Sequence, residues 1–493
     1  MRVFRYLGIS FIAMCVSWVL VTTATAAVTW EKTFGGSDYD VGMSVQQTTD
    51  GGYIIAGATG SFGIGGSNVY LIKTDASGKE LWSKTYGGSD YVMARCVQQT
   101  TDGGYIIAGE IVYEITGEDI YLVKTDASGT ELWSKTFGMR TTDRAYSVQE
   151  ANDGGYIIVG ETFVGGGSHD VWLIKTDANG NELWNKTYGG GGVDKGRAVK
   201  QTTDGGYIIV GATGSFGAGW VDTYLIKTDE NGNELWHKAF GGGGADGGHA
   251  VQQTTDGGYI IVGSTSSFGA GSYDVWLIKT DANGNELWSK TFGGSTWDYG
   301  HSVQQTTDGD YIICGFTGSF GAGNADVWLI KTNASGNQIW NKTFGGSEYD
   351  RGYSVQQTSD DGYIIAGDTD SFGAGGSDVY LIYYTDLPSK AINPNPSNGS
   401  TDISTNTDLS WSDGGGATSY DVYFGTDPTP ESDEFKGNQM STIYDPGGLA
   451  PDTTYYWRID AKNEFGPTTG DVWSFTTQYA QAMPGIPLLL LED

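Results

Sequence analysis

Apolar and polar positions in this chain form short runs of strand length. In one unit, residues 44–48 alternate, residues 53–57 and 69–73 are continuous apolar runs, and residues 80–85 form a fourth run of strand length. Continuous runs of this length are typical of strands that are covered on both faces. The Asp-Gly-Gly sequence at 50–52 favours a hairpin, because Asp and Gly tolerate positive φ. The unit is therefore predicted to contain four β-strands and no helix.

This unit recurs along most of the chain. A Trp-x-Lys strand marks each copy, with its tryptophans 51 or 52 residues apart: Trp30, Trp82, Trp133, Trp184, Trp236, Trp288 and Trp340. Units that repeat at this period cannot bury their apolar surface alone and must stack on their neighbours. Four strands per repeat indicate the blades of a β-propeller.

The two ends of the repeat region predict how the ring closes. The region begins with a lone fourth strand at residues 30–34, and its last unit stops at residue 384 without a Trp-x-Lys strand. The strands balance only if the N-terminal strand completes the last blade. Closure also removes the exposed sheet edges that promote aggregation. We predict an all-β chain in which residues 27–384 form a seven-bladed β-propeller of four-stranded blades, closed by the N-terminal strand.

The repeat resembles the tryptophan-docking propeller family, which includes quinoprotein dehydrogenases. The stretch 177–184, Asp-Ala-Asn-Gly-Asn-Glu-Leu-Trp, and its six counterparts are similar to that family's Ala-x-Asp-x-x-x-Gly-x-x-x-Trp motif. The resemblance covers about residues 28–384 and implies that each Trp docks between adjacent blades. Kelch propellers have a similar period, but their paired glycines follow an apolar strand, whereas Gly51 and Gly52 precede one.

The N-terminus predicts export. Arg2 and Arg5 precede an apolar run at residues 7–21, and Ala24-Thr25-Ala26 is a plausible cleavage site, so residues 1–26 are interpreted as a signal peptide. A membrane anchor is the alternative, although the run is short for a span. We expect a secreted or cell-surface protein without a transmembrane span in the mature chain.

A second domain follows a Pro-containing linker at 385–396. Residues 397–477 resemble a fibronectin type III module, because Leu449, Pro451, Thr453 and Tyr455 match the Leu-x-Pro-x-Thr-x-Tyr corner of that family. The resemblance implies a β-sandwich that serves as a spacer or docking unit. The tail, 478–493, resembles the start of a truncated surface-sorting signal or is a natural end.

Charge excludes one class of partner. The formal net charge is −32, which argues against nucleic acid because a phosphate backbone requires a basic patch. Of 19 lysines, 13 occupy the repeated Leu-Ile-Lys and Trp-x-Lys positions. The acids are equally regular. One set opens the first hairpin turn, where a structural role is expected: Asp50, Asp102, Asp153, Asp204, Asp256, Asp308 and Asp360.

Two further aspartate sets precede the first and third strands of the units. We interpret both as tying loops to the backbone, with a calcium site as the alternative. The first-strand set is Asp40, Asp143, Asp194, Asp246, Asp298 and Asp350, and the third-strand set is Asp119, Asp170, Asp222, Asp274, Asp326 and Asp378.

Catalysis finds little support in the motifs. The histidines, His169, His237, His249 and His301, lack metal-ligand spacing, and no Gly-x-Ser-x-Gly elbow is present. The arginines are few and occupy unrelated positions of the repeat. We therefore expect no cofactor, no metal site and no enzyme activity, with an extracellular quinoprotein-type or glycan-active enzyme as the alternative.

One position varies where the surrounding framework does not. Immediately before the Ser-Val-Gln-Gln strand, the units carry Met43, Arg95, Tyr146, Arg197, His249, His301 and Tyr353. At the mouth of the innermost strand these side chains would line the central channel. We expect the six polar and aromatic ones to bind a ligand, with the arginines pairing with a carboxylate or sulfate and the histidines titrating near neutrality. Plain surface drift is the alternative. The chain is thus predicted to be a monomeric binding or adhesion scaffold for an extracellular protein or glycan.

Overall fold

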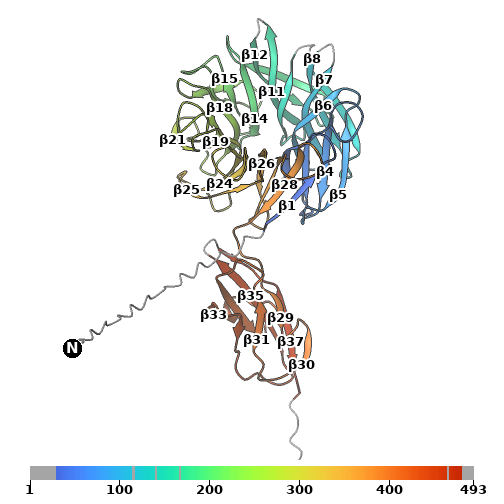
Figure 1. Cartoon of the computed structure of the whole chain (residues 1–493), viewed down its shortest axis with the longest axis vertical. Helices are drawn as coiled ribbons and strands as arrows, with labels where there is room; N and C mark the ends of the chain where they lie inside the picture. Colours follow the sequence, from blue (N-terminus) through green and yellow to red (C-terminus); the bar gives the residue numbers. More distant parts are fainter. Residues whose placement is uncertain (1–28, 114–116, 139–141, 166–167, 464–465, 480–493) are drawn as a thin grey trace, which may run out of the picture. The chain divides into compact units, whose positions relative to one another are not determined.

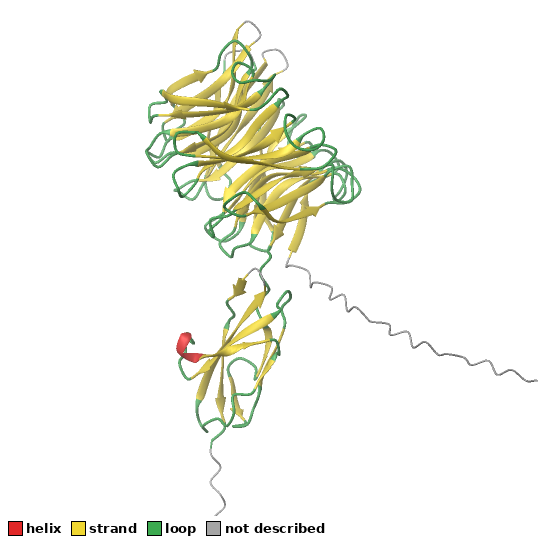
Figure 2. Cartoon of the chain, turned by 90° about the vertical axis from the view of Figure 1, so that its left-hand side faces the viewer, coloured by secondary structure: helices red, strands yellow, loops and turns green. Residues whose placement is uncertain are grey.

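The computed structural model describes residues 29–113, 117–138, 142–165, 168–463 and 466–479. These residues fold into two compact units, Thr29–Thr385 and the described chain from Asp386 onward (Figure 1). The predicted signal peptide and nearly all of the tail lie outside the described residues. Strands account for the regular structure apart from one short 3₁₀ turn, Ser432–Glu434 (Figure 2). Within the described ranges, no helix has the length and apolar character needed to cross a membrane.

The first unit consists of seven four-stranded antiparallel sheets, as predicted for a seven-bladed propeller. Blade 1 contains β2 (Asp40–Gln47), β3 (Tyr53–Thr59), β4 (Asn68–Thr74) and β5 (Glu80–Tyr86). Blade 2 contains β6 (Tyr91–Gln99), β7 (Tyr105–Tyr113), β8 (Gly117–Thr125) and β9 (Glu131–Phe137). Blade 3 contains β10 (Arg144–Glu150), β11 (Tyr156–Gly165), β12 (Ser168–Thr176) and β13 (Glu182–Tyr188).

The remaining blades repeat the same order. Blade 4 contains β14 (Asp194–Gln201), β15 (Tyr207–Thr213), β16 (Asp222–Thr228) and β17 (Glu234–Phe240). Blade 5 contains β18 (Asp246–Gln253), β19 (Tyr259–Thr265), β20 (Asp274–Thr280) and β21 (Glu286–Phe292). Blade 6 contains β22 (Asp298–Gln305), β23 (Tyr311–Thr317), β24 (Asp326–Thr332) and β25 (Gln338–Phe344). Blade 7 contains β26 (Asp350–Gln357), β27 (Tyr363–Thr369), β28 (Asp378–Tyr384) and β1 (Thr29–Phe34).

The N-terminal strand completes the last blade, which confirms the predicted closure. Strand β1 pairs antiparallel with β28, with Trp30 opposite Tyr383 and Phe34 opposite Val379 (Figure 1, blue beside orange). Blades 7 and 1 are also linked between their first strands, because the Gln47 amide donates to the Gln356 side-chain oxygen at 2.6 Å.

The tryptophans dock between blades, as the sequence resemblance implied. In blade 1, Trp82 lies on β5, and the centre of its ring is 6.0 Å from the centre of the Tyr105 ring of blade 2. Its ring also covers the turn at Gly129, where φ is +76° and an added Cβ would lie 2.7 Å from the indole. Glycine is required there both by the backbone conformation and by the close approach of the ring. Each Trp therefore joins one blade to the next.

Ion pairs between a buried lysine and an exposed aspartate fix the first hairpin of six blades. The Lys73 side chain is only 4% exposed, and its Nζ lies 3.0 Å from an Asp50 oxygen and donates to the Thr74 carbonyl at 2.8 Å. In blade 7 a tyrosine replaces the lysine, and the Tyr383 hydroxyl donates to Asp360 at 2.8 Å. These contacts give the hairpin aspartates the structural role predicted for them.

The second unit is a β-sandwich. One sheet contains β29 (Ile392–Asn395), β31 (Leu409–Ser412) and β34 (Ile443–Tyr444). The other contains β30 (Ser400–Ile403), β37 (Val472–Thr477), β35 (Thr454–Asn463), β32 (Ser419–Gly425) and β33 (Phe435–Gln439), with β36 (Gly466–Thr468) paired to β35. Strand β29 occupies part of the segment predicted as a linker.

Aromatic side chains fill the core of the sandwich. Trp411, Trp457 and Phe475 are buried together. The Tyr455 hydroxyl accepts a hydrogen bond from the Ala450 amide at 2.9 Å, which is the local contact expected of the corner motif.

Candidate functional site

The variable position is a β-bulge in every blade. The first strand of each blade slips register against the second at one residue, for example between Gly42 and Ser44 in blade 1. A bulged residue is left out of the ladder and its side chain is redirected. The seven bulged residues, here called the bulge ring, are Met43, Arg95, Tyr146, Arg197, His249, His301 and Tyr353.

The structure brings the whole bulge ring together. The guanidinium groups of Arg95 and Arg197 lie 5.7 and 5.0 Å from the centre of the Tyr146 ring. His249 stacks on His301 with ring centres 5.0 Å apart, and His301 lies 5.4 Å from Tyr353. Met43 and Tyr353 pack against one apolar cluster. Side chains from seven distant segments thus form two contacting, half-buried groups, one around Tyr146 and one around His301.

A second set of variable residues adjoins the bulge ring. In each blade, the residue two positions before the bulge faces a residue of the second strand. That second residue directly follows a glycine present in all seven blades, such as Gly57 in blade 1. These cross-strand pairs, here called the rim pairs, are Val41–Ala58, Met93–Glu110, Arg144–Glu161, Lys195–Ala212, Gly247–Ser264, Tyr299–Phe316 and Arg351–Asp368. Sequence reasoning missed them, although they depart from the repeat as clearly as the bulge position does.

The rim pairs correct the expectation that the arginines are scattered. The structure places Arg95, Arg144, Arg197 and Arg351 at the bulge ring and the rim pairs, and all of them except Arg197 pair with a buried acid. Arg95 pairs with Glu110 at 2.8 Å, Arg144 with Glu161 at 3.2 Å, and Arg351 with Asp368 at 3.0 Å. Lys195 also reaches Glu161, at 3.1 Å. The bulge position and the rim position are two residues apart on the same strand, so their side chains lie close together although they occupy different positions of the repeat.

Arg197 is the exception among these cations. Among the described residues it has no carboxylate partner, and its Nε is buried without a hydrogen-bond acceptor. Its guanidinium covers Tyr146, whose hydroxyl donates to Glu161 at 2.8 Å. A buried charged group without hydrogen-bond partners is unfavourable. An external anion that accepts hydrogen bonds from this guanidinium would therefore be favourable.

The histidines do not titrate near neutrality, contrary to the expectation from sequence. Burial and the Arg197 charge lower the pKa of His249 to about 4. Burial and the neighbouring His249 hold the pKa of His301 well below its usual value. His249 Nδ1 lies 2.8 Å from the Gly300 carbonyl and donates to it. Both rings are therefore neutral at physiological pH and contribute shape and hydrogen bonding.

A channel of about 540 Å³ is lined by the first strands of all seven blades. Its wall carries serines and glutamines from successive repeats, including Ser44 and Gln46. The Gln46 side-chain oxygen accepts the Gln99 amide of the next blade at 2.6 Å. This bond recurs around the channel and defines an amide belt of Gln46, Gln98, Gln149, Gln252, Gln304 and Gln356, with Lys200 in the place of the seventh glutamine.

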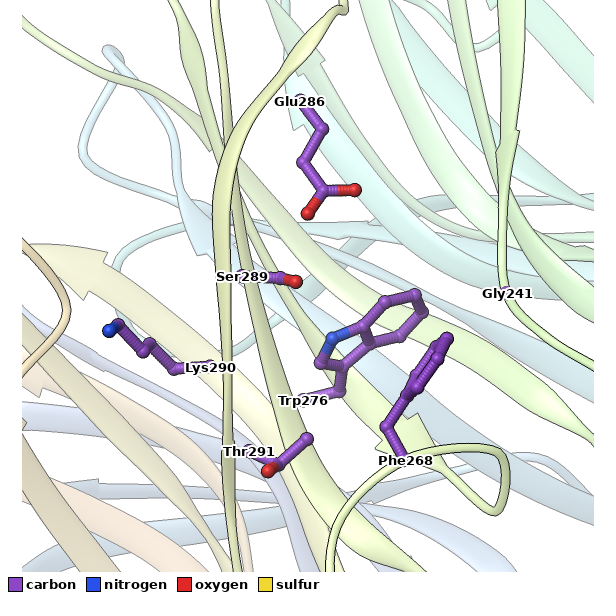
Figure 3. Close-up of a pocket in the computed structure, with 7 residues that line it drawn as sticks. All are labelled: Gly241, Phe268, Trp276, Glu286, Ser289, Lys290 and Thr291. Atoms are coloured by element: carbon purple, nitrogen blue, oxygen red, sulfur yellow. The ribbon is translucent and has the colours of Figure 1, made fainter.

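A different pocket lies on the outer strands of blade 5 (Figure 3). Phe268 and Trp276 lie side by side in it, near Glu286, whereas the Lys290 side chain points away from the two rings; the volume of the pocket is about 400 Å³. Trp276 is only 4% exposed. The next blade has an equivalent pocket with Phe320 and Trp328. The pocket recurs in equivalent positions of two blades, and its tryptophan ring is almost fully buried. We therefore interpret it as a consequence of blade packing and not as a binding site.

The two regular aspartate sets tie loops, as interpreted from sequence. Asp246 accepts the Gly242 amide at 2.8 Å and the Ser267 hydroxyl at 2.6 Å, and Asp274 accepts the Ala270 amide at 2.8 Å. Within the part of the chain that the structure describes, no three His, Cys, Asp or Glu residues are grouped so as to hold a metal ion.

No family model and no curated protein matches this chain. Solved structures with a similar arrangement include the extracellular domain of the putative one component system BT4673 from B. thetaiotaomicron, 12% identical with a TM-score of 0.44, covering 92% of this chain and 59% of that one. This chain therefore spans less than two thirds of that domain. A protein of unknown function from Dyadobacter fermentans is 11% identical with a TM-score of 0.40, covering 73% and 99%. Sqt1 from Chaetomium thermophilum is 11% identical with a TM-score of 0.41, covering 90% and 100%.

Proposed function

We propose that this protein is a secreted or cell-surface binding protein, whose propeller holds a ligand at the bulge ring. The observation that carries the proposal is the bulge ring itself. Side chains of four kinds stand at seven equivalent positions of a repeated framework, and each directly precedes a residue that lines one channel. Identical scaffolding with dissimilar residues at one opening creates an asymmetric polar surface, as a specific binding site requires.

The proposal assigns roles to the other parts of the chain. Residues 1–26 direct export, and the fibronectin-like module of residues 397–477 is a spacer. The ligand is an extracellular glycan or protein, and the chain acts as a monomer. High negative charge elsewhere keeps an exported protein soluble.

Binding arrays of glycans and extracellular proteins test this proposal. The ring variant carries Arg197→Met, His249→Met and His301→Met, because Met43 shows that the bulge accepts methionine. A control variant, Lys32→Met with Lys84→Met, alters two exposed lysines of outer strands. We expect the parent and the control to bind the same probes and the ring variant to lose them. The proposal fails if the ring variant binds like the parent, or if the parent binds no probe.

A glycan-active enzyme is the second candidate, favoured by one contact. The Tyr146 hydroxyl bonds to Glu161 beside several arginines, and some glycosidases use a tyrosine nucleophile. Burial and the Glu161 charge, however, raise the pKa of Tyr146 to about 12, which disfavours the phenolate. Hydrolysis of fluorogenic acidic glycosides that is lost in Tyr146→Phe would favour this candidate over simple binding.

A further inference from the structure

We infer that the channel at blade 4 is an anion subsite that takes the carboxylate or sulfate group of an acidic saccharide. The inference rests on the proposed function and specifies the ligand of that site. It starts from strand β14, which carries three basic residues: Lys195, Arg197 and Lys200. The first strands of the next two blades, β18 and β22, carry no lysine or arginine.

Two of the three cations have no carboxylate partner among the described residues. Lys195 is neutralised by Glu161 at 3.1 Å. Arg197 has a buried Nε without an acceptor, and neither Arg197 nor Lys200 has a carboxylate partner among the residues described. Lys200 is exposed and lines the channel. Of these two residues, Lys200 lines the channel as part of the amide belt, and Arg197 lies three residues before it on the same strand, in the bulge ring beside the channel lining.

The wall of the channel adds hydrogen-bond donors. The side-chain oxygens of the amide belt already accept backbone amides of the neighbouring blade, for example Gln98 from Glu150 at 2.7 Å. This leaves the NH₂ group of each belt glutamine, which has no acceptor within the described structure, available to a ligand. Ser44 likewise accepts the Val97 amide at 3.2 Å, which leaves its hydroxyl hydrogen free. The belt therefore presents unused N–H donors to the channel.

The local charge opposes that of the whole molecule. The residues that line the channel include Lys200 but no aspartate or glutamate, although the chain has a formal charge of −32. Donors and positive charge in a concave, partly dehydrated site favour an oxyanion. The acidic surface elsewhere repels anions. The positive charge of the channel therefore makes it the favoured place for an anion to bind.

Size and chemistry favour a saccharide over a bare ion. A channel of about 540 Å³ is in the range of small-molecule sites and exceeds the needs of a single oxyanion. Serine hydroxyls and glutamine amides around the wall match the hydroxyl groups of a sugar. The faces of Tyr146 are covered by guanidinium groups, so ionic and hydrogen-bonding contacts carry the recognition.

Calorimetry with matched probes tests the inference: glucuronate, its uncharged counterpart glucose, sodium sulfate and an oligoglutamate peptide. Lys200→Gln restores the glutamine of the other six blades, and Arg197→Met copies blade 1. Lys84→Met is the charge-matched control. We expect glucuronate to bind the parent at least tenfold more tightly than glucose, sulfate or the peptide. Lys200→Gln and Arg197→Met should each weaken glucuronate at least tenfold, while Lys84→Met leaves it unchanged. Raising salt should weaken the binding.

Several results would overturn the inference. Equal affinity for glucuronate and glucose removes the anion subsite, and so does full glucuronate binding by Lys200→Gln with an unchanged melting temperature. Equal or tighter binding of sulfate assigns a bare oxyanion site, and preference for the peptide assigns an acidic protein segment. If array probes are lost in the ring variant while glucuronate never binds, only this inference fails. If the ring variant keeps its array probes, the proposed function fails as well.

Discussion

At the scale of single residues, the bulge ring contains both anchored and free side chains. Arg95 is anchored, because it donates twice to Glu110, a side chain only 6% exposed. Arg197 has no such partner. In blade 1 the equivalent positions of Arg95 and Glu110 carry Met43 and Ala58. The framework therefore accepts either an ion pair or two apolar residues there.

This difference predicts the stability of two variants. Arg95→Met should lower the free energy of unfolding by about 3 kcal/mol, the lower end of the range for breaking a buried pair because Arg95 is partly exposed, since it leaves the Glu110 carboxylate buried and unpaired. The double variant Arg95→Met with Glu110→Ala should recover most of that loss, since it copies blade 1. Urea denaturation measures both. Equal stability of the single variant and the parent would show that Glu110 is solvated or protonated.

The bulge ring could be located from the sequence, but its partners could not. Variation at one position of a repeat is visible in the chain itself, so Arg197 and His301 were predicted to share a site. Glu110 and Glu161 directly follow runs interpreted only as buried strands, and their contacts depend on strand register. Register and bulges are set by packing between strands, which periodicity alone does not reveal. The low pKa of the histidines follows from burial in the same way.

At the scale of elements, aspartates meet where neighbouring blades adjoin. A Cβ added to Gly293 would lie 1.8 Å from an Asp274 oxygen and 2.8 Å from an Asp298 oxygen, so both carboxylates face this glycine. Burial, opposed by one amide hydrogen bond and reinforced by the Asp298 charge, raises the pKa of Asp274. Between blades 1 and 2 the equivalent residues are Asn68 and Val92. Where Asn68 replaces the aspartate before the third strand, Val92 replaces the aspartate before the next blade's first strand. The two aspartates are therefore lost together at this junction.

The raised pKa predicts how Asp274→Asn behaves. Because the folded state holds its proton to higher pH than the unfolded state, this carboxyl destabilises the fold as pH rises through its folded pKa. Asp274→Asn removes that penalty while keeping an acceptor for the Ala270 amide. The melting temperature of the variant should exceed that of the parent at pH 8, with a smaller difference at pH 4. A lower melting temperature at pH 8 contradicts this, and calcium-dependent stabilisation of the parent alone would instead assign a cation to the pair.

At the scale of the whole molecule, closure of the ring was predictable because it follows from counting strands. Seven sets of three strands and seven fourth strands balance in one way, and the pairing of β1 with β28 is the result. The channel chemistry was not predictable to the same degree. It depends on which atoms of the amide belt are already used between blades, and only the assembled ring shows that their oxygens are engaged while their NH₂ groups remain.

Closure predicts that the first tryptophan matters as much as an internal one. Trp30 packs on Tyr53 and Tyr383 with ring centres 6.0 and 5.6 Å apart, and it covers the turn at Gly78. Trp82 holds the equivalent place between blades 1 and 2. Trp30→Ala and Trp82→Ala should therefore each lower the free energy of unfolding by about 3 kcal/mol, since each leaves a similar cavity at a blade junction and both indoles are partly exposed. Urea denaturation and light scattering of both variants measure this. In an open array the N-terminal residue would lie at a frayed end, so a Trp30→Ala variant as stable as the parent, beside a destabilised Trp82→Ala, would contradict the closed ring.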